Sequence, residues 1–563
     1  MNSRCCSMRT ILILAVCQIP LTAQEIRGSV VDVNGHPVAD VAVHVASYSS
    51  RLAYTDSLGE FVTESLSPGN YVLRFYKFGW VGFETKVNLS GSDITLPPWG
   101  MVFGDLDANG SVNLVDAALM NDELDLPVTN FNRYLDVDGS GKLDALDLDQ
   151  VLNVMESDGV VAPEWIVSKP DYVTYVPTSE NGKDATNQHY LMLALPARRL
   201  FGVWTQGSRE AAPNQQMTFH VSNDDGRTWS EPRAIDGPLF DSRIASWGFS
   251  IFAPNFDRIY VFYAKDIGTR LNGVAEMFVK YTDDLGISWY GPFKFQFRRG
   301  DYSPSDTTIP PAWWVFQNPI LVDGKPMVGF TEILNKPDTV GYSTEVRFMV
   351  FENILIERDV SKLQITTYPT GPYGLRGSYR ANTDRSTVQE PSIANLPDGR
   401  LICVMRSGQG FPYYAVSLDT GKTWSAPAPL LYGDGQAVVP QPLAPCPLFQ
   451  LSEGGYLLVF HNNNGDANGG VGPADLFHNR TPAYVSIGRD AGPGKLQPIE
   501  FSQPVMILEN YVRPWGPDDR TEIATYPSLT EDETSYVLWY PDRKHFLLGK
   551  RLPKPISKLL LSR

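Results

Sequence analysis

Two charged residues flank a predicted β-hairpin between residues 389 and 425, and they are the first candidates for chemistry. Glu390 precedes the hairpin, Pro397–Gly399 supplies its turn, and Arg406 ends its second strand. A carboxylate can exchange protons with a neighbouring group, and a guanidinium can hold an anion with two parallel hydrogen bonds. We therefore predict that the chemistry of this segment depends on Glu390 and Arg406.

Two further loops, shortly after residue 100, have the ligand spacing of calcium sites. Oxygen-bearing side chains stand at the ligand positions of each loop, and a glycine stands where the sharp turn requires one. The first loop offers Asp105, Asp107, Asn109, Asn113 and Asp116, and the second offers Asp136, Asp138, Ser140, Asp144 and Asp147. Predicted helices follow, from Ala117 and over Leu148–Met155. An acidic linker would not repeat the same register twice, so we predict two structural Ca²⁺ ions.

Repeated short motifs indicate the elements that position Glu390 and Arg406. The pattern S-x-D-x-G-x-T-W, an Asp box, occurs at Ser222–Trp229 and Ser417–Trp424, with a conservative copy at Thr282–Trp289 and a degenerate one at Ser486–Asp490. Its polar residues suit local hydrogen bonds, and its tryptophan can pack beneath the turn. We predict that Trp229, Trp289 and Trp424 are buried under equivalent hairpins of a repeating four-stranded unit, as in a β-propeller.

Composition limits the class of protein. The 563 residues predict two to four domains, and 12% aromatic residues with 43 prolines and 47 glycines favour a turn-rich β protein. The net charge of −16 argues against a nucleic-acid partner. It does not exclude an anionic substrate, because a local group of arginines can oppose the overall sign.

The first 23 residues have the features of a secretory signal peptide. Arg4 and Arg9 precede the apolar run Ile11–Cys17, and small residues follow. Cys17 suggests a lipoprotein anchor, but the branched Val16 before it argues against one. We predict a secreted, periplasmic or extracellular protein without a membrane span. Beyond the signal peptide, Cys403 and Cys446 are predicted to be buried thiols.

Three resemblances to known families follow from these motifs. Residues 24–98 resemble a carboxypeptidase regulatory-like β-sandwich through the strings G-x-V-x-D-x-x-G-x-P-V, T-D-x-x-G-x-F and P-G-x-Y-x-L. The duplicated loop and helix of residues 100–157 resemble a dockerin, a small helical EF-hand-like module, which implies Ca²⁺ and a cohesin-like partner; a calcium-stiffened spacer is the alternative. Residues 160–563, with their Asp boxes, resemble the sialidase superfamily. The implied fold is mainly β, with a six-bladed propeller.

The sialidase resemblance implies a tyrosine-based active site. Glu390 matches the glutamate that activates the nucleophile, and Tyr526, in the string Tyr-Pro-Ser-Leu, matches the nucleophile. A sialic acid carries a carboxylate beside its anomeric carbon, which would repel a carboxylate nucleophile. The resemblance implies substrate-binding roles for Arg406, Arg480 and Arg209.

The start of the sialidase-like region departs from the family pattern. The strand at residues 189–196 contains no arginine where the family has its first substrate-binding arginine. The aspartate expected as general acid is also missing, and Glu210 and Asp266 are the carboxyl groups available for that role.

The function implied by these resemblances is exo-glycoside hydrolysis at an acidic, sialic-acid-type glycan terminus. One alternative is another enzyme of acidic polysaccharides on the same fold, such as a uronate-directed hydrolase or lyase. A second alternative is a non-catalytic propeller that binds glycans. Contact between Glu390 and Tyr526 in a pocket would favour the enzymes, whereas aromatic platforms without paired ionisable groups would favour the binding protein.

Overall fold

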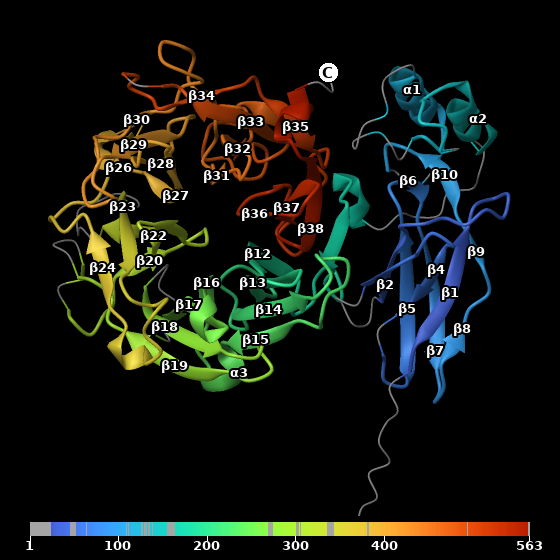
Figure 1. The fold of residues 1–563 in the computed structure, drawn as a ribbon, viewed down its shortest axis with the longest axis horizontal. Helices are drawn as coiled ribbons and strands as arrows, with labels where there is room; N and C mark the ends of the chain where they lie inside the picture. The colour runs from blue at the N-terminus through green and yellow to red at the C-terminus, as the bar shows by residue number, and fades with distance from the viewer. Residues whose placement is uncertain are drawn as a thin grey trace, which may run out of the picture.

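The computed structural model describes residues 24–560, apart from 46–51, 64, 109, 111, 125–127, 129–131, 133–134, 138, 155–163, 268–273, 300–302, 305, 335–342, 380–381 and 493. The predicted signal peptide and two predicted calcium ligands, Asn109 and Asp138, lie outside the described residues. Figure 1 shows an elongated N-terminal part beside a ring of sheets.

The N-terminal part is a sandwich of two sheets and a small two-stranded sheet. One sheet has the order β4-β1-β8 with β9 also on β1, the other has the order β3-β2-β5-β7, and β10 pairs with β6. The strands are β1 (Ile26–Val31), β2 (Ala42–Val45), β3 (Leu52–Tyr54), β4 (Glu60–Val62), β5 (Gly69–Tyr76), β6 (Gly79–Val81), β7 (Phe83–Leu89), β8 (Ile94–Thr95), β9 (Trp99–Gly100) and β10 (Val102–Asp105). Alternate residues of β5, namely Tyr71, Leu73 and Phe75, enter the core. The pairings of β1 with β8 and β9 are parallel, so the sandwich is not wholly antiparallel.

Two helices cover one end of the sandwich (Figure 1). They are α1 (Leu114–Glu123) and α2 (Ala145–Val154), which begin close to the predicted positions. Asn113 caps α1 through its side chain, and the Asn113 backbone N–H donates a hydrogen bond to Asp116 Oδ2 at 2.8 Å. Met120 of α1 and Val151 of α2 are buried in the same core as the sandwich, so the helical module and the sandwich share one apolar interior.

Among the described residues of the C-terminal region, six sheets of four or five strands surround a common centre (Figure 1). The first sheet contains β12 (Thr186–Leu195), β13 (Arg199–Gly207), β14 (Gln216–Ser222) and β15 (Arg233–Asp236). The second contains β16 (Ala245–Ala253), β17 (Arg258–Asp266), β18 (Ala275–Thr282) and β19 (Tyr290–Phe295). The third contains β20 (Ala312–Trp314), β21 (Ile320–Val322), β22 (Lys325–Leu334), β23 (Ser343–Phe351) and β24 (Ile365–Tyr368). Each pairs its strands antiparallel in nearly sequential order.

The remaining three sheets continue around the same centre (Figure 1). The fourth sheet contains β27 (Gln389–Asn395), β28 (Leu401–Arg406), β29 (Tyr413–Ser417) and β30 (Ala428–Pro429). The fifth contains β31 (Leu448–Gln450), β32 (Tyr456–Phe460), β33 (Ala483–Asp490), β34 (Ile499–Phe501) and β35 (Val505–Leu508). The sixth contains β36 (Ser528–Glu531), β37 (Ser535–Asp542), β38 (Phe546–Pro553) and β11 (Tyr172–Tyr175). The pairing of β11 with β38 joins the beginning of the region to its end. The mainly β class is thereby confirmed.

Short elements connect these sheets. The described connections include α3 (Pro238–Asp241), the strand pair β25 (Ser378–Tyr379) and β26 (Asn382–Ser386), and the 3-10 helices Glu164–Ser168, Pro254–Phe256, Val360–Lys362, Ala467–Gly469 and Ile556–Leu560. Among the described residues, we find no helix that is both long enough and apolar enough to span a bilayer. The predicted thiols Cys403 and Cys446 are both buried and free.

The three Asp boxes occupy equivalent turns, each between the third and fourth strands of a sheet. In the first box, Ser222 Oγ accepts a hydrogen bond from Gly226 N at 2.8 Å, and Asp224 Oδ1 accepts one from Thr228 N at 2.8 Å. Gly226 has a φ of 87°, and a Cβ there would lie 2.4 Å from Trp539 of the neighbouring sheet. Only glycine satisfies both conditions.

Burial of the box tryptophans differs from the prediction. Trp229 is fully buried, whereas Trp289 and Trp424 are only half-buried. Trp229 packs edge-on against the fully buried Trp539, while Trp424 stacks on Phe348. The predicted degenerate box Ser486–Asp490 is also wrong, because these residues continue strand β33.

Candidate active site

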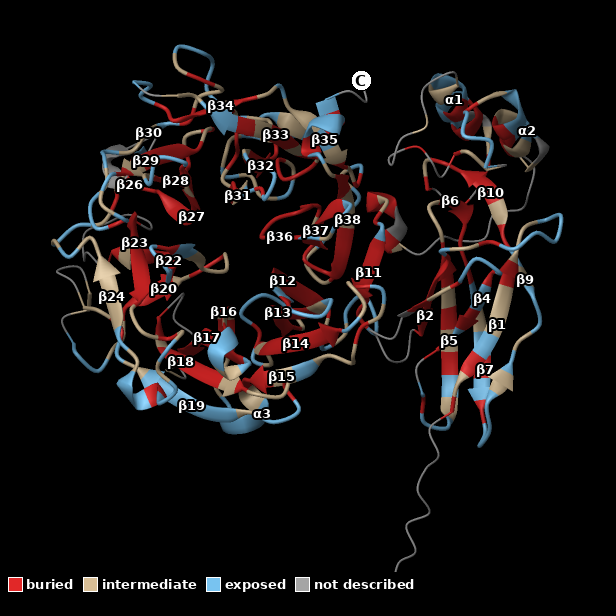
Figure 2. Cartoon of the chain, in the orientation of Figure 1, coloured by how far each residue is buried: buried red, intermediate tan, exposed pale blue. Residues whose placement is uncertain are grey.

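A cavity of about 460 Å³ lies among the innermost strands of the ring. Its lining combines ionisable, amide and aromatic groups, among them Gln188, His189, Glu210, Asp266, Trp314, Gln389, Glu390, Arg406 and Tyr526. Figure 2 shows that the strands around the centre are largely buried, whereas exposed segments lie on the outside of the ring. A cavity of this size, with convergent polar groups, has the properties of a small-molecule site.

Tyr526, Glu390 and Arg406 meet in this cavity. The Tyr526 hydroxyl donates a hydrogen bond to Glu390 Oε1 at 3.2 Å, and Arg406 Nη1 forms an ion pair with Glu390 Oε2 at 2.7 Å. Arg406 Nη1 also lies 3.4 Å from the Tyr526 hydroxyl oxygen. The carboxylate therefore contacts both the phenol and the guanidinium, although Tyr526 is distant from both in sequence.

Neighbouring side chains fix Glu390 and Arg406. Trp314 Nε1 donates to Glu390 Oε1 at 3.2 Å, and the Glu390 backbone N–H donates to Thr331 at 2.7 Å. Arg406 Nε donates to Gln389 Oε1 at 2.9 Å. With these contacts, both charged groups are held by partners on different strands, which favours a single arrangement of the site.

Irregularities in the innermost strands turn the site residues toward the centre. The strand register shifts at His189 in β12, at Trp247 in β16 and at Glu390 in β27. Each of these residues has a positive φ, between 50° and 58°, which is uncommon for residues other than glycine. Such β-bulges bend a strand and redirect a side chain, so they supply the geometry that a regular strand would not.

The surroundings of Tyr526 keep its phenol protonated. Burial raises the pKa of Tyr526 above its ordinary value, and the charge of Glu390 raises it further. The nearby cations Arg406, Lys544 and Arg480 act in the opposite direction without reversing the shift. The phenol consequently needs a base before its oxygen can attack, and Glu390 is the carboxylate within hydrogen-bond distance.

His189 is a site residue that the sequence did not identify as functional. Its ring lies 4.1 Å from the ring of Tyr526, centroid to centroid, and neither ring nitrogen has a hydrogen-bond partner. Burial lowers the pKa of His189 to about 3, with a further contribution from the charge of Lys544. The imidazole is therefore neutral at neutral pH, and it occupies the strand on which the first arginine was expected.

The two carboxyl groups considered as general acids both line the cavity. Glu210 accepts hydrogen bonds from Lys544 Nζ at 2.9 Å and from Arg520 Nη2 at 3.0 Å. Lys544 is the main cause that lowers the pKa of Glu210 to about 2, so this carboxylate is ionised at neutral pH. Asp266 ends strand β17 at the wall of the cavity.

Two predicted substrate-binding arginines do not line the cavity. Arg480 is buried against Glu522 at 3.4 Å and donates to the Leu443 carbonyl oxygen at 2.6 Å. Arg209 is exposed, and it lies 3.6 Å from Asp518 and donates to the Pro517 carbonyl oxygen at 3.1 Å. Among the described residues, Arg406 is the arginine that reaches the cavity. In this arrangement Arg480 acts on Tyr526 and Glu390 through its charge and not through a position in the cavity lining.

A second set of charges lies behind the cavity and was also missed. Lys544 Nζ lies 3.4 Å from Glu522 Oε1 and 5.7 Å from the centre of the Tyr526 ring. Glu522 is fully buried, and it pairs with Arg480 as well as Lys544. One sequence feature pointed to Lys544, namely the charged string at residues 542–545. No sequence feature indicated that this string lies beside Glu522.

The predicted calcium loops form two matching arrangements. Side-chain oxygens of Asp105, Asp107 and Asp116 lie within 4.8 Å of one another. Asp116 accepts from Leu106 N at 2.7 Å, and in the second loop Asp147 accepts from Val137 N at 2.8 Å. This clustering of carboxylate oxygens in a closed loop suits a hard cation, and the donor set fits calcium.

Comparisons with known proteins bear on all three parts of the chain. A family model described as a BNR repeat-like domain matches residues 198–537, which is more than half of the chain. A carboxypeptidase regulatory-like domain matches residues 25–96, and a dockerin type I domain matches residues 103–156. These matches confirm the three predicted resemblances. A search of curated proteins found no match.

Solved structures with a similar chain path include several sialidases. The Hadza microbial sialidase is 14% identical, with a TM-score of 0.46, 66% of this chain covered and 66% of the sialidase covered. The intramolecular trans-sialidase of Ruminococcus gnavus is 15% identical, with a TM-score of 0.44 and coverage of 68% and 98%. A leech intramolecular trans-sialidase is 12% identical, with a TM-score of 0.45 and coverage of 93% and 92%. By its match over residues 198–537, the chain belongs to the BNR repeat-like domain family.

Proposed function

We propose that the protein is a secreted, sialidase-like exo-glycoside hydrolase that acts on an acidic glycan terminus. The observation that carries this proposal is the 3.2 Å hydrogen bond between Tyr526 and Glu390 inside the cavity. A phenol and a carboxylate in contact can serve as nucleophile and base, whereas a binding protein has no need of the pair. Of the alternatives, this contact favours the enzymes over the non-catalytic propeller.

In the first step, the Tyr526 oxygen attacks the anomeric carbon while Glu390 accepts the phenolic proton. The glycosidic C–O bond breaks, and its electron pair leaves with the oxygen of the departing group. Arg406 offsets the negative charge shared between Glu390 and the phenol, since it contacts both at 2.7 and 3.4 Å. A neutral nucleophile of this kind avoids repulsion by a substrate carboxylate.

The departing oxygen takes its proton from Asp266, which ends β17 at the wall of the cavity. Glu210 is already committed as an anion between Lys544 and Arg520. In the second step, Asp266 takes a proton from the attacking water, and Tyr526 regains its own proton from Glu390 as the sugar leaves. The enzyme thus returns to its starting protonation, and the configuration at the anomeric carbon is retained.

Removal of the Tyr526 hydroxyl tests this function. Tyr526→Phe should lower kcat at least about 1,000-fold on sialosides or acidic oligosaccharides while substrate binding changes little, because the attacking oxygen is lost but the cavity remains. Tyr536→Phe is the matched control, since Tyr536 is also buried and its hydroxyl has no hydrogen-bond partner. Full activity of Tyr526→Phe would contradict the proposal.

A second candidate function is supported by the positions of the arginines. Arg480 and Arg209 are engaged outside the cavity, and His189 is neutral where the sialidase resemblance implied a cation. A substrate whose carboxylate lies further from the anomeric carbon, such as a uronate, would need fewer cations there. A uronate-directed hydrolase or lyase is therefore the alternative, and activity on uronate polymers but not on sialosides would select it.

We also infer that the chain has the domain order and the closed propeller that the sequence predicts. The pairing of β11 with β38 supports a closed, six-bladed propeller over residues 160–563. It would follow a signal peptide at 1–23, a β-sandwich at 24–98 and a dockerin-like module at 100–157, with secretion implied by the signal peptide.

For the dockerin-like module, we propose two bound Ca²⁺ ions and a cohesin-like partner. The first ion would be held by Asp105, Asp107, Asn109, Asn113 and Asp116, and the second by Asp136, Asp138, Ser140, Asp144 and Asp147. The clustered oxygens of the first loop and the dockerin type I match support this assignment. The ions would be structural, and catalysis would not require them.

A further inference from the structure

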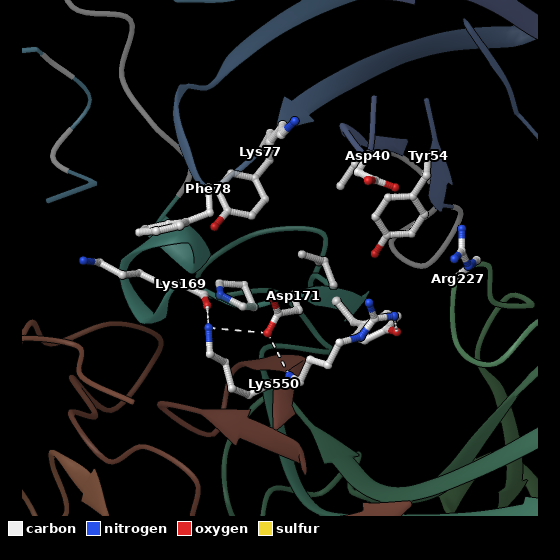
Figure 3. A pocket seen from close by; sticks show the side chains of 14 residues that line it. Asp40, Tyr54, Lys77, Phe78, Lys169, Asp171, Arg227 and Lys550 are labelled. Carbon is white, nitrogen blue, oxygen red and sulfur yellow. Dashed lines mark hydrogen bonds and ion pairs between the residues drawn. The ribbon is translucent and has the colours of Figure 1, made fainter. Parts of the chain in front are cut away.

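A second cavity, of about 550 Å³, lies between the N-terminal sandwich and the ring of sheets. Figure 3 shows Asp40, Tyr54, Lys77 and Phe78 on the side of the sandwich, opposite Lys169, Asp171 and Lys550. Arg227, from the turn of the first Asp box, also lines it, as does Arg551 of β38. The cavity is large enough for a small ligand, and it shares no lining residue with the Tyr526 cavity.

The charge of this cavity opposes that of the whole chain. Its lining includes the five basic residues Lys77, Lys169, Arg227, Lys550 and Arg551 but only two acidic residues, in a chain whose net charge is −16. Asp171 is already occupied, since it accepts from the Arg551 backbone N–H at 2.7 Å and pairs with Lys550 at 3.4 Å. The excess of positive charge favours an anionic ligand.

Lys169 and Arg551 differ in how far other groups already meet their charge. Lys169 Nζ lies over the Phe78 ring at 4.9 Å, and the carboxylates Asp107, Asp105 and Asp116 of the first calcium loop already act on its charge. Arg551 contacts the Tyr172 hydroxyl, but its buried Nε–H has no hydrogen-bond partner. A carboxylate or sulfate could receive such donors, because a charged acceptor strengthens the hydrogen bond.

The walls of the cavity are held together by a shared apolar core. Tyr76 of the sandwich packs edge-on against Trp165 at 4.3 Å, and both belong to a core cluster that also includes Val173 of β11. Tyr54 and Phe78 give the cavity aromatic surface beside its cations. The combination of rings and cations is suited to a ligand with both apolar faces and acidic groups.

From these features we propose that the cavity between the sandwich and the ring binds an anionic saccharide, through a carboxylate or a sulfate on the sugar. The preference for an anion follows from the cavity itself, whereas the choice of a saccharide rests on the proposed function of the chain. Sugar rings would pack against Tyr54 and Phe78, and Arg227 and Arg551 would hold the acidic group. The site would retain an acidic glycan at a distance from the cavity where Tyr526 acts.

Titration calorimetry on the full chain tests this site. The starting protein would be Tyr526→Phe, so that no turnover interferes, and the probes would be a monosulfated chondroitin disaccharide, its unsulfated form and neutral diacetylchitobiose. We expect both acidic probes to bind and the neutral probe to bind at least about tenfold more weakly. Tighter binding of the sulfated probe would assign the sulfate as the recognised group, and equal binding would assign the carboxylate.

Single substitutions locate the binding. Arg227→Ala and Arg551→Gln should each weaken acidic-probe binding about tenfold, as expected for the loss of a charge-assisted contact, and binding should weaken with added salt. The control is Arg489→Ala, an exposed arginine that does not line the cavity. Unchanged affinity in both cavity variants, or equal binding of diacetylchitobiose, would overturn the proposal.

A further variant separates this proposal from the proposed function. If Arg406→Ala abolishes probe binding while Arg227→Ala has no effect, the probe occupies the Tyr526 cavity and the second site is refuted, although the hydrolase remains. If the cavity variants weaken binding but Tyr526→Phe retains full activity, the second site stands and the hydrolase mechanism is refuted.

Discussion

Arg406 contacts both members of the proposed catalytic pair, whereas Arg209 contacts neither. Arg406 is buried between Glu390 and Gln389, and Arg209 is 63% exposed beside Asp518. This contrast shows why the same residue type can have very different effects in one site: a buried ion pair leaves an unpaired charge when one partner is removed, but an exposed pair is largely solvated.

The first prediction compares these two arginines. Arg406→Ala should lower kcat/KM about 30- to 160-fold, because it removes a charge-assisted contact worth about 2–3 kcal/mol. Arg209→Ala should change kcat/KM less than about threefold. Steady-state kinetics on the best acidic substrate would measure both. A larger loss for Arg209→Ala would show that this arginine moves into the cavity when substrate binds.

At the scale of elements, local motifs could be predicted from sequence and bulges could not. An Asp box is held together by hydrogen bonds within its own short string, such as the one from Thr228 N to Asp224. Its conformation can therefore be predicted from the string alone. The bulges that present His189 and Glu390 depend on a positive φ at residues other than glycine, and no local pattern marks them. Glu522 was likewise hidden, because only the fold brings it to its partners Arg480 and Lys544.

The second prediction concerns the tryptophans of the boxes. Trp229→Ala should destabilise the ring of sheets by about 3–5 kcal/mol, because Trp229 is fully buried against Trp539. Trp424→Ala should cost about half as much, since Trp424 is only half-buried over Phe348. Urea unfolding followed by circular dichroism would measure the difference, and equal losses would argue against burial as the cause.

The third prediction concerns the calcium loops. In the full chain, calorimetry should detect two Ca²⁺ ions, and Asp105→Ala or Asp136→Ala should each remove one. Chelation should lower the unfolding temperature of the helical module, because its clustered carboxylates then repel one another. Asp122→Ala, an exposed change within α1, is the control and should leave both ions bound. Retention of both ions after the loop substitutions would refute the assigned ligands.

For the molecule as a whole, burial of histidines links folding to pH. Burial is the main cause that lowers the pKa of five of them: His44 and His189 to about 3, His461 and His545 to about 4, and His220 well below its ordinary value. They are spread over the sandwich and the ring, so no single site accounts for the effect. Each remains neutral in the folded protein at a pH where the unfolded chain binds a proton.

The last prediction follows from the sign of these shifts. Below the unfolded pKa of about 6.5, the unfolded chain binds more protons than the folded one, so stability should fall as pH decreases from about 6.5 to 4. Each buried histidine contributes up to about 1.4 kcal/mol per pH unit to this loss. Unfolding curves at several pH values would measure the slope for the wild type, for His545→Gln and for the control His36→Gln, whose side chain is exposed. The slope of stability against pH should be smaller in His545→Gln than in the wild type, and unchanged in His36→Gln. If the slope is also unchanged in His545→Gln, the loss of stability arises from the carboxylates instead.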